Sequence, residues 1–330
     1  MIPKSLVFMT TYKCNFICDH CSVGCTPHNT EILSFDIIKQ AIDQAYAIPS
    51  IRLVVFTGGE SSLVPDLLQQ GLIYASEKGF RTRMVSNGWW AKTSEKANEY
   101  VRTWVGYGLN ELNISYDDFH APHLKRYGGE HNVINAIQAA SQNGLSPLIG
   151  IVLHPKAKIT STYLRGVFAK IGLTEGIQYL EDFIFPLGRA RQLPTEMFVL
   201  PEDKSNEAPC QEAGTTLVVL PSGDVTFCCG HLINTEAQHI ITQGNIKSGE
   251  TLEEMVGRMQ RNVFYWWLNK EGPYSIIKEM GFEGDVYRNC EGCHYLATKY
   301  YDDLLALAGK KEEIFAKIER RAPIDVNVSA

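Results

Sequence analysis

The sequence lacks several features that would place it in other protein classes. It has no excess of positive charge, because 31 lysines and arginines against 37 aspartates and glutamates give a formal net charge of −6. This balance argues against a general nucleic-acid or anionic-membrane binder, which would be basic. No stretch approaches about 18 consecutive apolar residues, so no membrane span is expected. The N-terminal apolar run is too short for an export signal, and the sequence contains no internal repeat or low-complexity tract.

Cysteine is abundant by comparison. Nine cysteines, an odd number, occur in a chain of 330 residues, which is too long for a disulfide-stabilised miniprotein. In a chain without an export signal, clustered cysteines are better explained as metal or redox ligands than as a disulfide framework. We therefore expect a cytoplasmic protein. Its 45% hydrophobic and 21% charged residues are typical of a compact globule with an ample core.

The first two-thirds of the chain alternates short β-rich runs with helical patterns. Apolar residues in 34–48 and 131–144 recur at three- and four-residue spacing, which predicts amphipathic helices. The expected strands lie at residues 5–12, 52–60, 81–88, 111–118, 146–154 and 178–189. Such β–α alternation implies parallel strands joined by right-handed crossovers. We expect an α/β protein with a partial (β/α)6, TIM-like barrel.

The composition becomes polar across residues 194–209, where we place a domain boundary. Residues 1–205 would form the barrel and residues 206–330 a smaller, irregular domain. Within the latter, residues 215–229 indicate a hairpin around a Pro-Ser-Gly-Asp turn, and helical patterns follow.

Three cysteines follow the first expected strand with the spacing C-x3-C-x2-C, namely Cys14, Cys18 and Cys21. In a barrel of parallel strands, the loops after the strands converge on one face, where active sites lie. Three thiolates would leave one iron of a 4Fe–4S cluster open to a small molecule that carries an amine and a carboxylate. Two alternatives remain at this point. One is a zinc site completed by His20 or Cys25, and the other is a ferredoxin-type cluster completed by Cys25, although ferredoxins usually have a first gap of two residues.

Glycines and polar residues end the next strands. The second strand ends in Gly58, Gly59 and Glu60, where glycines let the backbone approach a ligand closely and the carboxylate is an acceptor for an ammonium. The third strand ends in Ser86 and Asn87, and the fourth ends in Ser115, Tyr116 and Asp117. Each residue alone is also explained as a turn or cap. Polar groups at consecutive strand ends are more easily explained as the wall of one pocket.

These motifs resemble those of the radical S-adenosylmethionine (radical SAM) superfamily, and the resemblance covers the whole barrel. It implies that the three cysteines hold a 4Fe–4S cluster whose fourth iron is chelated by the amino and carboxylate groups of SAM. It further implies that the Gly-Gly-Glu motif meets the methionyl ammonium, that His20 lies against the adenine, and that Ser86, Asn87 and Ser115 contact the ribose and carboxylate. The implied chemistry is cleavage of SAM to methionine and a 5′-deoxyadenosyl radical, which abstracts a hydrogen atom from the substrate.

Five more cysteines lie beyond the expected boundary, at Cys210, Cys228, Cys229, Cys290 and Cys293. Four of them would close a second cluster and leave one thiol over; a zinc site that uses the C-x2-C pair is the main alternative. The set comprises a cysteine, a hairpin that ends in cysteine, and a terminal C-x2-C. This order resembles the SPASM and Twitch extensions of peptide- and sugar-modifying radical SAM enzymes. It implies one auxiliary 4Fe–4S cluster.

Cys228 and Cys229 are adjacent, at the end of an expected strand. Successive side chains of a strand point to opposite faces, so one thiol would face the auxiliary cluster and the other the barrel mouth. A protonated thiol there can return a hydrogen atom to a carbon radical. Removing hydrogen from one face of an α-carbon and returning it to the other inverts the centre.

The segments CNFICDHCSVGCTP, FTGGE, SNGWW, ISYDDFHAPH, FCCG and CEGC together resemble the radical SAM peptide epimerases that make D-residues in epipeptide-type ribosomal peptides. The resemblance implies that Cys229 donates the hydrogen atom. It implies that the auxiliary ligands are Cys210, Cys228, Cys290 and Cys293. The expected partners are a ribosomal precursor peptide and a reductant such as flavodoxin or ferredoxin.

Other functions remain open from the sequence. On the same scaffold, the product could be a thioether or carbon–carbon crosslink or a dehydrogenated residue, and a protein of another class would be a non-enzymatic zinc or electron-transfer protein. We also expect the chain to lack its own leader-binding module, because the cluster cysteines begin at Cys14. The substrate would then dock on the barrel mouth or C-terminal cap, or be delivered by another protein.

Overall fold

One sheet organises the chain. The computed structural model describes residues 2–202, 204–228, 231–307 and 309–310. Within these residues a nine-stranded sheet has the order β6-β5-β4-β3-β2-β1-β7-β8-β9. Neighbouring strands are parallel from β6 to β7, whereas β7, β8 and β9 pair antiparallel. The strands are β1 (Ser5–Met9), β2 (Leu53–Thr57), β3 (Arg81–Ser86), β4 (Glu111–Ser115), β5 (Ser146–Leu153), β6 (Gln178–Phe183), β7 (Thr216–Val219), β8 (Asp224–Thr226) and β9 (Thr242–Asn245).

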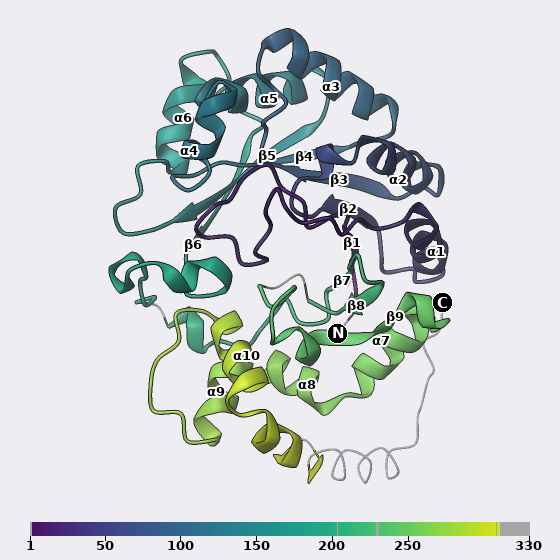
Figure 1. Ribbon diagram of the computed structural model, residues 1–330, viewed down its shortest axis with the longest axis vertical. Helices are drawn as coiled ribbons and strands as arrows, with labels where there is room; N and C mark the ends of the chain where they lie inside the picture. Colours follow the sequence, from purple (N-terminus) through teal and green to yellow (C-terminus); the bar gives the residue numbers. More distant parts are fainter. Residues whose placement is uncertain (1, 203, 229–230, 308, 311–330) are drawn as a thin grey trace.

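Helices cover the outer side of the parallel strands (Figure 1). They are α1 (Phe35–Tyr46), α2 (Pro65–Glu77), α3 (Ser94–Gly106), α4 (Ala121–Leu124), α5 (Glu130–Gln142) and α6 (Ser161–Ala169). Helix α1 shows why these segments are helical. Its buried side chains include Ile38, Ala41, Ile42 and Ala45, whose three- and four-residue spacing forms one apolar stripe toward the sheet.

The six strands expected from the sequence are all present, and their parallel pairing is confirmed. Helices α1 and α5 overlap the two predicted amphipathic segments. The sheet ends at β6 on one side and at β9 on the other. This α/β arrangement is consistent with the expected partial barrel.

The hairpin expected at residues 215–229 is present as β7 and β8, and it joins the barrel sheet directly. Strand β7 pairs parallel with β1, with Ser5 opposite Thr216. The expected boundary between residues 205 and 206 therefore separates two segments that share one continuous sheet. Strand β1 lies between β2 from the first segment and β7 from the second.

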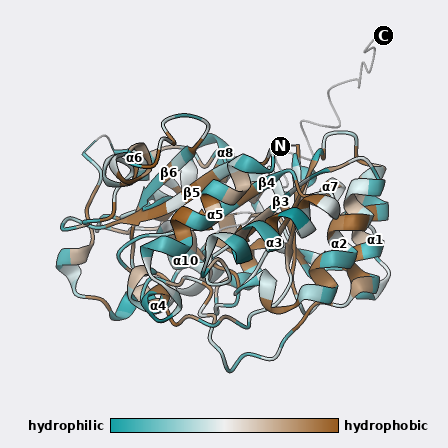
Figure 2. Ribbon diagram, turned by 90° about the horizontal axis from the view of Figure 1, so that it is seen from above, coloured by the Kyte–Doolittle hydropathy of each residue, from teal (hydrophilic) through white to brown (hydrophobic). Residues whose placement is uncertain are grey.

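The C-terminal helices pack below this sheet in the view of Figure 1. They are α7 (Leu252–Arg261), α8 (Val263–Lys270), α9 (Gly272–Glu279) and α10 (Asn289–Thr298). Figure 2 shows apolar residues concentrated along the central strands, while the covering helices alternate polar and apolar faces. Among the described residues, no helix combines the length and apolar character that crossing a bilayer requires.

Candidate active site

A cavity of about 410 Å3 lies at the carboxyl ends of the parallel strands. The loop after β1, the ends of β2, β3 and β4, and the segment that follows β6 form its wall. Nearly all the residues predicted for the first site line it: Cys14, Cys18, Cys21, His20, Gly58, Gly59, Ser86, Asn87 and Ser115. The prediction that the strand ends form one pocket agrees with this arrangement.

The three cysteines of the first group are largely enclosed. Burial raises the pKa of Cys14 to about 12, and the charge of Glu60 adds to the rise. Burial also raises the pKa of Cys18, with Cys14 and Cys21 adding to it. Burial disfavours the thiolate form, so these sulfurs would carry negative charge beside a compensating positive group such as a metal centre. Three thiols on one wall of a cavity thus fit the open-iron cluster that the sequence resemblance implies.

Cys25 lines the same cavity and is 3% exposed. Its thiol donates a hydrogen bond to Cys21, which lowers the pKa of Cys21 and raises that of Cys25. Cys25 therefore contacts a predicted cluster ligand.

Arg189, just after β6, holds the cysteine loop by its backbone. Its Nε donates to the carbonyl of Cys18 at 2.9 Å, and its Nη1 donates to the carbonyl of Cys25 at 3.0 Å. Its own backbone N–H donates to the carbonyl of Cys21 at 3.2 Å. The sequence alone does not indicate this role, because 168 positions separate Arg189 from Cys21 (189 − 21 = 168).

Gly58 and Gly59 are required by close contact with the cysteine loop. A Cβ at Gly58, whose φ is +150°, would lie 2.5 Å from the Thr11 carbonyl oxygen. A Cβ at Gly59 would lie 2.2 Å from the Lys13 carbonyl oxygen. The Gly59 N–H also donates to the Thr11 carbonyl at 2.7 Å. The loop after β1 is thereby fixed against the end of β2.

Glu60 was expected to meet a ligand ammonium, but it is not among the residues that line the cavity. Its carboxylate accepts hydrogen bonds from Ser62 Oγ at 2.6 Å, from Ser86 Oγ at 2.9 Å and from the Asn87 backbone N–H at 2.8 Å. These donors account for its burial, which raises its pKa. In this structure the carboxylate joins the ends of β2 and β3.

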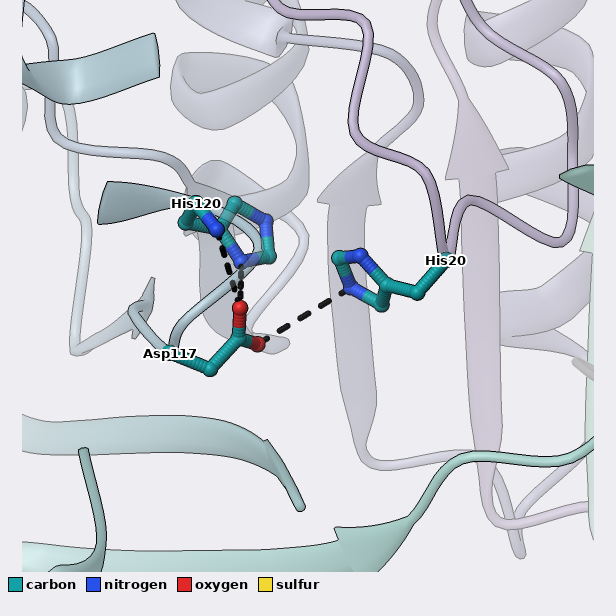
Figure 3. A group of neighbouring side chains, drawn as sticks. All are labelled: His20, Asp117 and His120. Atoms are coloured by element: carbon teal, nitrogen blue, oxygen red, sulfur yellow. Dashed lines mark hydrogen bonds and ion pairs between the residues drawn. The ribbon is translucent and has the colours of Figure 1, made fainter. Parts of the chain in front are cut away.

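Figure 3 shows His20, Asp117 and His120 close together. Asp117 is buried, and the two partly buried histidines line the cavity. Asp117 Oδ1 accepts from His120 Nδ1 at 2.9 Å, and Asp117 Oδ2 lies 3.8 Å from His20 Nε2. His20 stacks on Phe119, with ring centroids 4.8 Å apart. The cluster adds His120, which sequence reasoning left out of the site, to the cavity wall, and Asp117, an expected strand-end residue, holds its ring. The signal was an aspartate at a strand end with a histidine three positions later.

The electrostatics of this cluster favour one charged pair and one neutral ring. Burial raises the pKa of Asp117, but the charge and hydrogen bond of His120 outweigh it, and the net shift is downward. Burial lowers the pKa of His120, but the charge and hydrogen bond of Asp117 have the larger effect, so the net shift is upward. Burial lowers the pKa of His20 to about 3. The three residues could bind a metal by their spacing, but backbone N–H groups of Phe119 and Val152 already occupy Asp117.

A second cavity, of about 30 Å3, lies between the hairpin and α10. Its lining combines apolar side chains with four thiols, those of Cys210, Cys228, Cys290 and Cys293. Cys290 and Cys293 lie three residues apart in α10, a spacing that puts both on one helix face. Burial, with Cys210 and Cys290 nearby, raises the pKa of Cys293 well above its usual value. The structure therefore brings together the four residues predicted to hold an auxiliary cluster.

The predicted geometry of the cysteine pair differs from the structure. Strand β8 ends at Thr226, two residues before Cys228, after a register shift between Val225 and Thr226. Alternation along a strand therefore does not apply to the pair. Cys229, the predicted hydrogen donor, lies outside the described residues. His231, just beyond it, lines the first cavity, where its Nδ1 is 2.8 Å from Ser22 Oγ.

The fold and the three-cysteine cavity define a radical SAM domain. Residues 8–159 match the family model of the radical SAM superfamily, so this part of the chain is a radical SAM domain.

Known proteins resemble the chain over different lengths. YydG of Bacillus subtilis (strain 168), whose name associates it with peptide biosynthesis, is 23% identical over 329 residues, which cover 92% of this chain and 99% of YydG. The GTP 3′,8-cyclase of Vibrio vulnificus (strain YJ016) is 28% identical over 152 residues, 43% of each chain. The solved structure of anSMEcpe with bound AdoMet has a TM-score of 0.56 at 12% identity and covers 93% of this chain and 99% of that one. The structural similarity supports the fold along most of the chain.

Proposed function

We propose that this chain is a radical SAM peptide epimerase, which converts L-residues of a ribosomally made peptide to D-residues. In this proposal Cys14, Cys18 and Cys21 hold the SAM-binding 4Fe–4S cluster. The bound cluster and SAM supply a 5′-deoxyadenosyl radical that removes an α-hydrogen. The peptide class is supported by the full-length similarity to YydG, whose name assigns it to peptide biosynthesis, and by the sequence motifs.

The chain's own residues shape the first cavity for SAM. Gly58 and Gly59 allow the cysteine loop to lie against β2, and Arg189 fixes its carbonyl groups. The neutral, stacked His20 offers a flat ring to an adenine. Ser115 lines the cavity and remains the candidate contact for the ribose or carboxylate.

The observation that carries the epimerase proposal is the separation of thiols between two cavities. Cys228 lines the second cavity and His231 lines the first, only three positions further along the chain. In the sequence, Cys229 lies between these two lining residues. Four of the five C-terminal cysteines would bind the auxiliary cluster, namely Cys210, Cys228, Cys290 and Cys293. Cys229 is then left to donate the hydrogen atom. On this proposal residues 206–330 form the auxiliary-cluster region, and a flavodoxin or ferredoxin supplies electrons.

The test is product analysis with the precursor peptide encoded nearest to this gene, under strict anaerobiosis in deuterated water. In ordinary water, epimerisation leaves the peptide mass unchanged. In deuterated water it adds one deuterium to each inverted residue, because a thiol exchanges its hydrogen with solvent. The Cys229→Ser variant should keep both clusters, about eight irons per chain, and cleave SAM. It should lose most D-product, because an O–H bond is too strong to be a useful donor.

The matched control is Cys25→Ser, since Cys25 is a thiol outside the two ligand sets and lines the first cavity. It should retain D-product formation in proportion to its remaining iron. A loss of two hydrogens from the product would instead assign crosslinking or dehydrogenation. Full epimerisation by Cys229→Ser would reject Cys229 as the donor.

A further inference from the structure

Asn87 follows β3 and points its side-chain amide at the cysteine loop. Its Nδ2 donates to Asn15 Oδ1 at 2.9 Å and lies 3.8 Å from Cys14 Sγ, within hydrogen-bond range for sulfur. The residue is 6% exposed and lines the first cavity. This position differs from the ribose or carboxylate contact expected from the sequence, because both amide hydrogens already face protein partners.

The orientation of this amide is determined by its neighbours. The backbone N–H of Trp89 donates to Asn87 Oδ1 at 3.1 Å, and an N–H group has no acceptor capacity. The oxygen must therefore face Trp89, and the NH2 group must face the cysteine loop. The Asn87 backbone is held as well, since its N–H donates to the buried Glu60 carboxylate. Asn87 thus presents a fixed donor to one sulfur.

The sulfur of Cys14 receives a second donor from the backbone. The Phe16 N–H lies 3.4 Å from Cys14 Sγ. Both contacts are made by N–H groups, which are donors, so both stabilise negative charge on this sulfur. The Phe16 donor belongs to the loop itself, whereas Asn87 reaches the sulfur from the segment that follows β3.

We infer that Asn87 is a positioning residue that sets the reduction potential of the SAM-binding cluster through its hydrogen bond to Cys14. Hydrogen bonds to cluster sulfurs are one of the means by which a protein tunes iron–sulfur potentials. One-electron reduction adds negative charge that the cluster shares with its thiolates. A fixed N–H donor stabilises the reduced form more than the oxidised form and therefore raises the potential. This inference rests on the proposed cluster ligation by Cys14.

The experiment compares Asn87→Leu with the wild-type holoenzyme, each with both clusters loaded. Leucine has the same number and branching of side-chain heavy atoms as asparagine and lacks the donor. A potentiometric titration with dithionite is monitored by electron paramagnetic resonance. The signal that changes on adding SAM identifies the SAM-binding cluster. The Leu variant should need a more negative potential, with a reduced-to-oxidised ratio up to about tenfold smaller at a fixed potential, equivalent to ~59 mV for one electron.

Two further variants separate tuning from loop architecture. Asn15→Ala removes the other partner of the amide and leaves the Asn87 donor to Cys14, so its potential should stay at the wild-type value. Asn87→Asp keeps the acceptor for Trp89 but presents no N–H to the sulfur, so its potential should also fall. An unchanged potential in an iron-replete Leu or Asp variant would overturn the inference. Loss of the SAM-responsive cluster from both would overturn it too, by assigning Asn87 to loop structure alone.

These results are distinguishable from a failure of the proposed function. If no cluster forms on Cys14, Cys18 and Cys21 in the wild type, the proposed function itself fails. If the wild type has the cluster but makes a crosslinked product, the epimerase assignment fails while the potential shift can still be measured.

Discussion

At Gly59 the absence of a single side-chain carbon determines where the cysteine loop can lie. The loop backbone occupies the space in which a Cβ would stand, 2.2 Å from the Lys13 carbonyl oxygen. Lys13 directly precedes Cys14, so a displacement there moves the first predicted ligand. The glycines of this motif therefore serve the metal site through backbone packing, in addition to any contact with SAM.

We expect Gly59→Ala to lose most of the iron of the SAM-binding cluster and all SAM cleavage. The clash is with backbone, which relaxes less readily than a flexible side chain, so the free energy of unfolding should fall by about 3 kcal/mol, the upper end of overpacking costs. Iron analysis and chemical denaturation measure the two effects.

The matched control is Gly166→Ala in α6, where a Cβ would meet no atom within 4 Å. Alanine is favoured over glycine in a helix by about 0.5–1 kcal/mol, so this variant should be slightly stabilised and keep its iron. Wild-type iron content in Gly59→Ala would show that the loop adapts to the added carbon.

Residue identities and spacings predicted much of the site, and side-chain directions much less. The seven cysteines predicted as cluster ligands line two separate cavities, as expected. Thiols at such spacings have few other uses. The hydrogen bonds of the buried Glu60 carboxylate and the direction of the Asn87 amide were not predictable. Both depend on groups from other parts of the chain, here Ser86 at the end of β3 and Cys14 in the loop after β1.

At the scale of elements, helix α10 supplies half of the second thiol set. Cys290 and Cys293 share a face of the helix because one turn separates them. The helix thereby presents both sulfurs to Cys210 and Cys228 across the same small cavity. The spacing matters more than the residues between the two cysteines.

Insertion of one alanine between Glu291 and Gly292 should therefore rotate Cys293 by about 100° relative to Cys290. We expect loss of the auxiliary cluster, about half of the iron, while SAM binding at the first cluster persists. Iron analysis and the SAM-responsive resonance signal check this outcome. An alanine inserted between Gly284 and Asp285, both exposed, is the control and should keep all the iron, since exposed loops tolerate insertion. Wild-type iron content in the variant with alanine between Glu291 and Gly292 would show that α10 does not supply cluster ligands.

The elements of the barrel were predictable because each carries its own local pattern of apolar residues. The pairing of β7 with β1 was not. A hairpin was expected at residues 215–229, and its strands are present, but nothing in a local pattern indicates which distant strand a hairpin will join. The consequence is a second half of the molecule that completes the sheet of the first.

For the whole molecule, this continuity predicts that the two halves do not fold separately. A chain ending at residue 205 would expose the edge of β1, whose Leu6, Val7 and Phe8 are buried in the intact protein. Uncovered apolar edge strands pair with other chains. We expect the fragment 1–205 to aggregate in size-exclusion chromatography, whereas the full chain elutes as a discrete species. A monodisperse fragment that binds the first cluster would contradict this expectation.

The position of β1 also has a consequence for biosynthesis. Ser5 and Thr216, whose hydroxyl groups lie 3.1 Å apart, are separated by 211 positions in the sequence. At a translation rate of roughly 5–20 residues per second, β7 leaves the ribosome about 10–40 s after β1. During that interval the nascent chain carries the thiols of Cys14, Cys18 and Cys21 on a loop whose supporting strand has one neighbour missing. Iron delivery is therefore best timed after translation has passed β7, and oxygen has its longest access to those thiols before then.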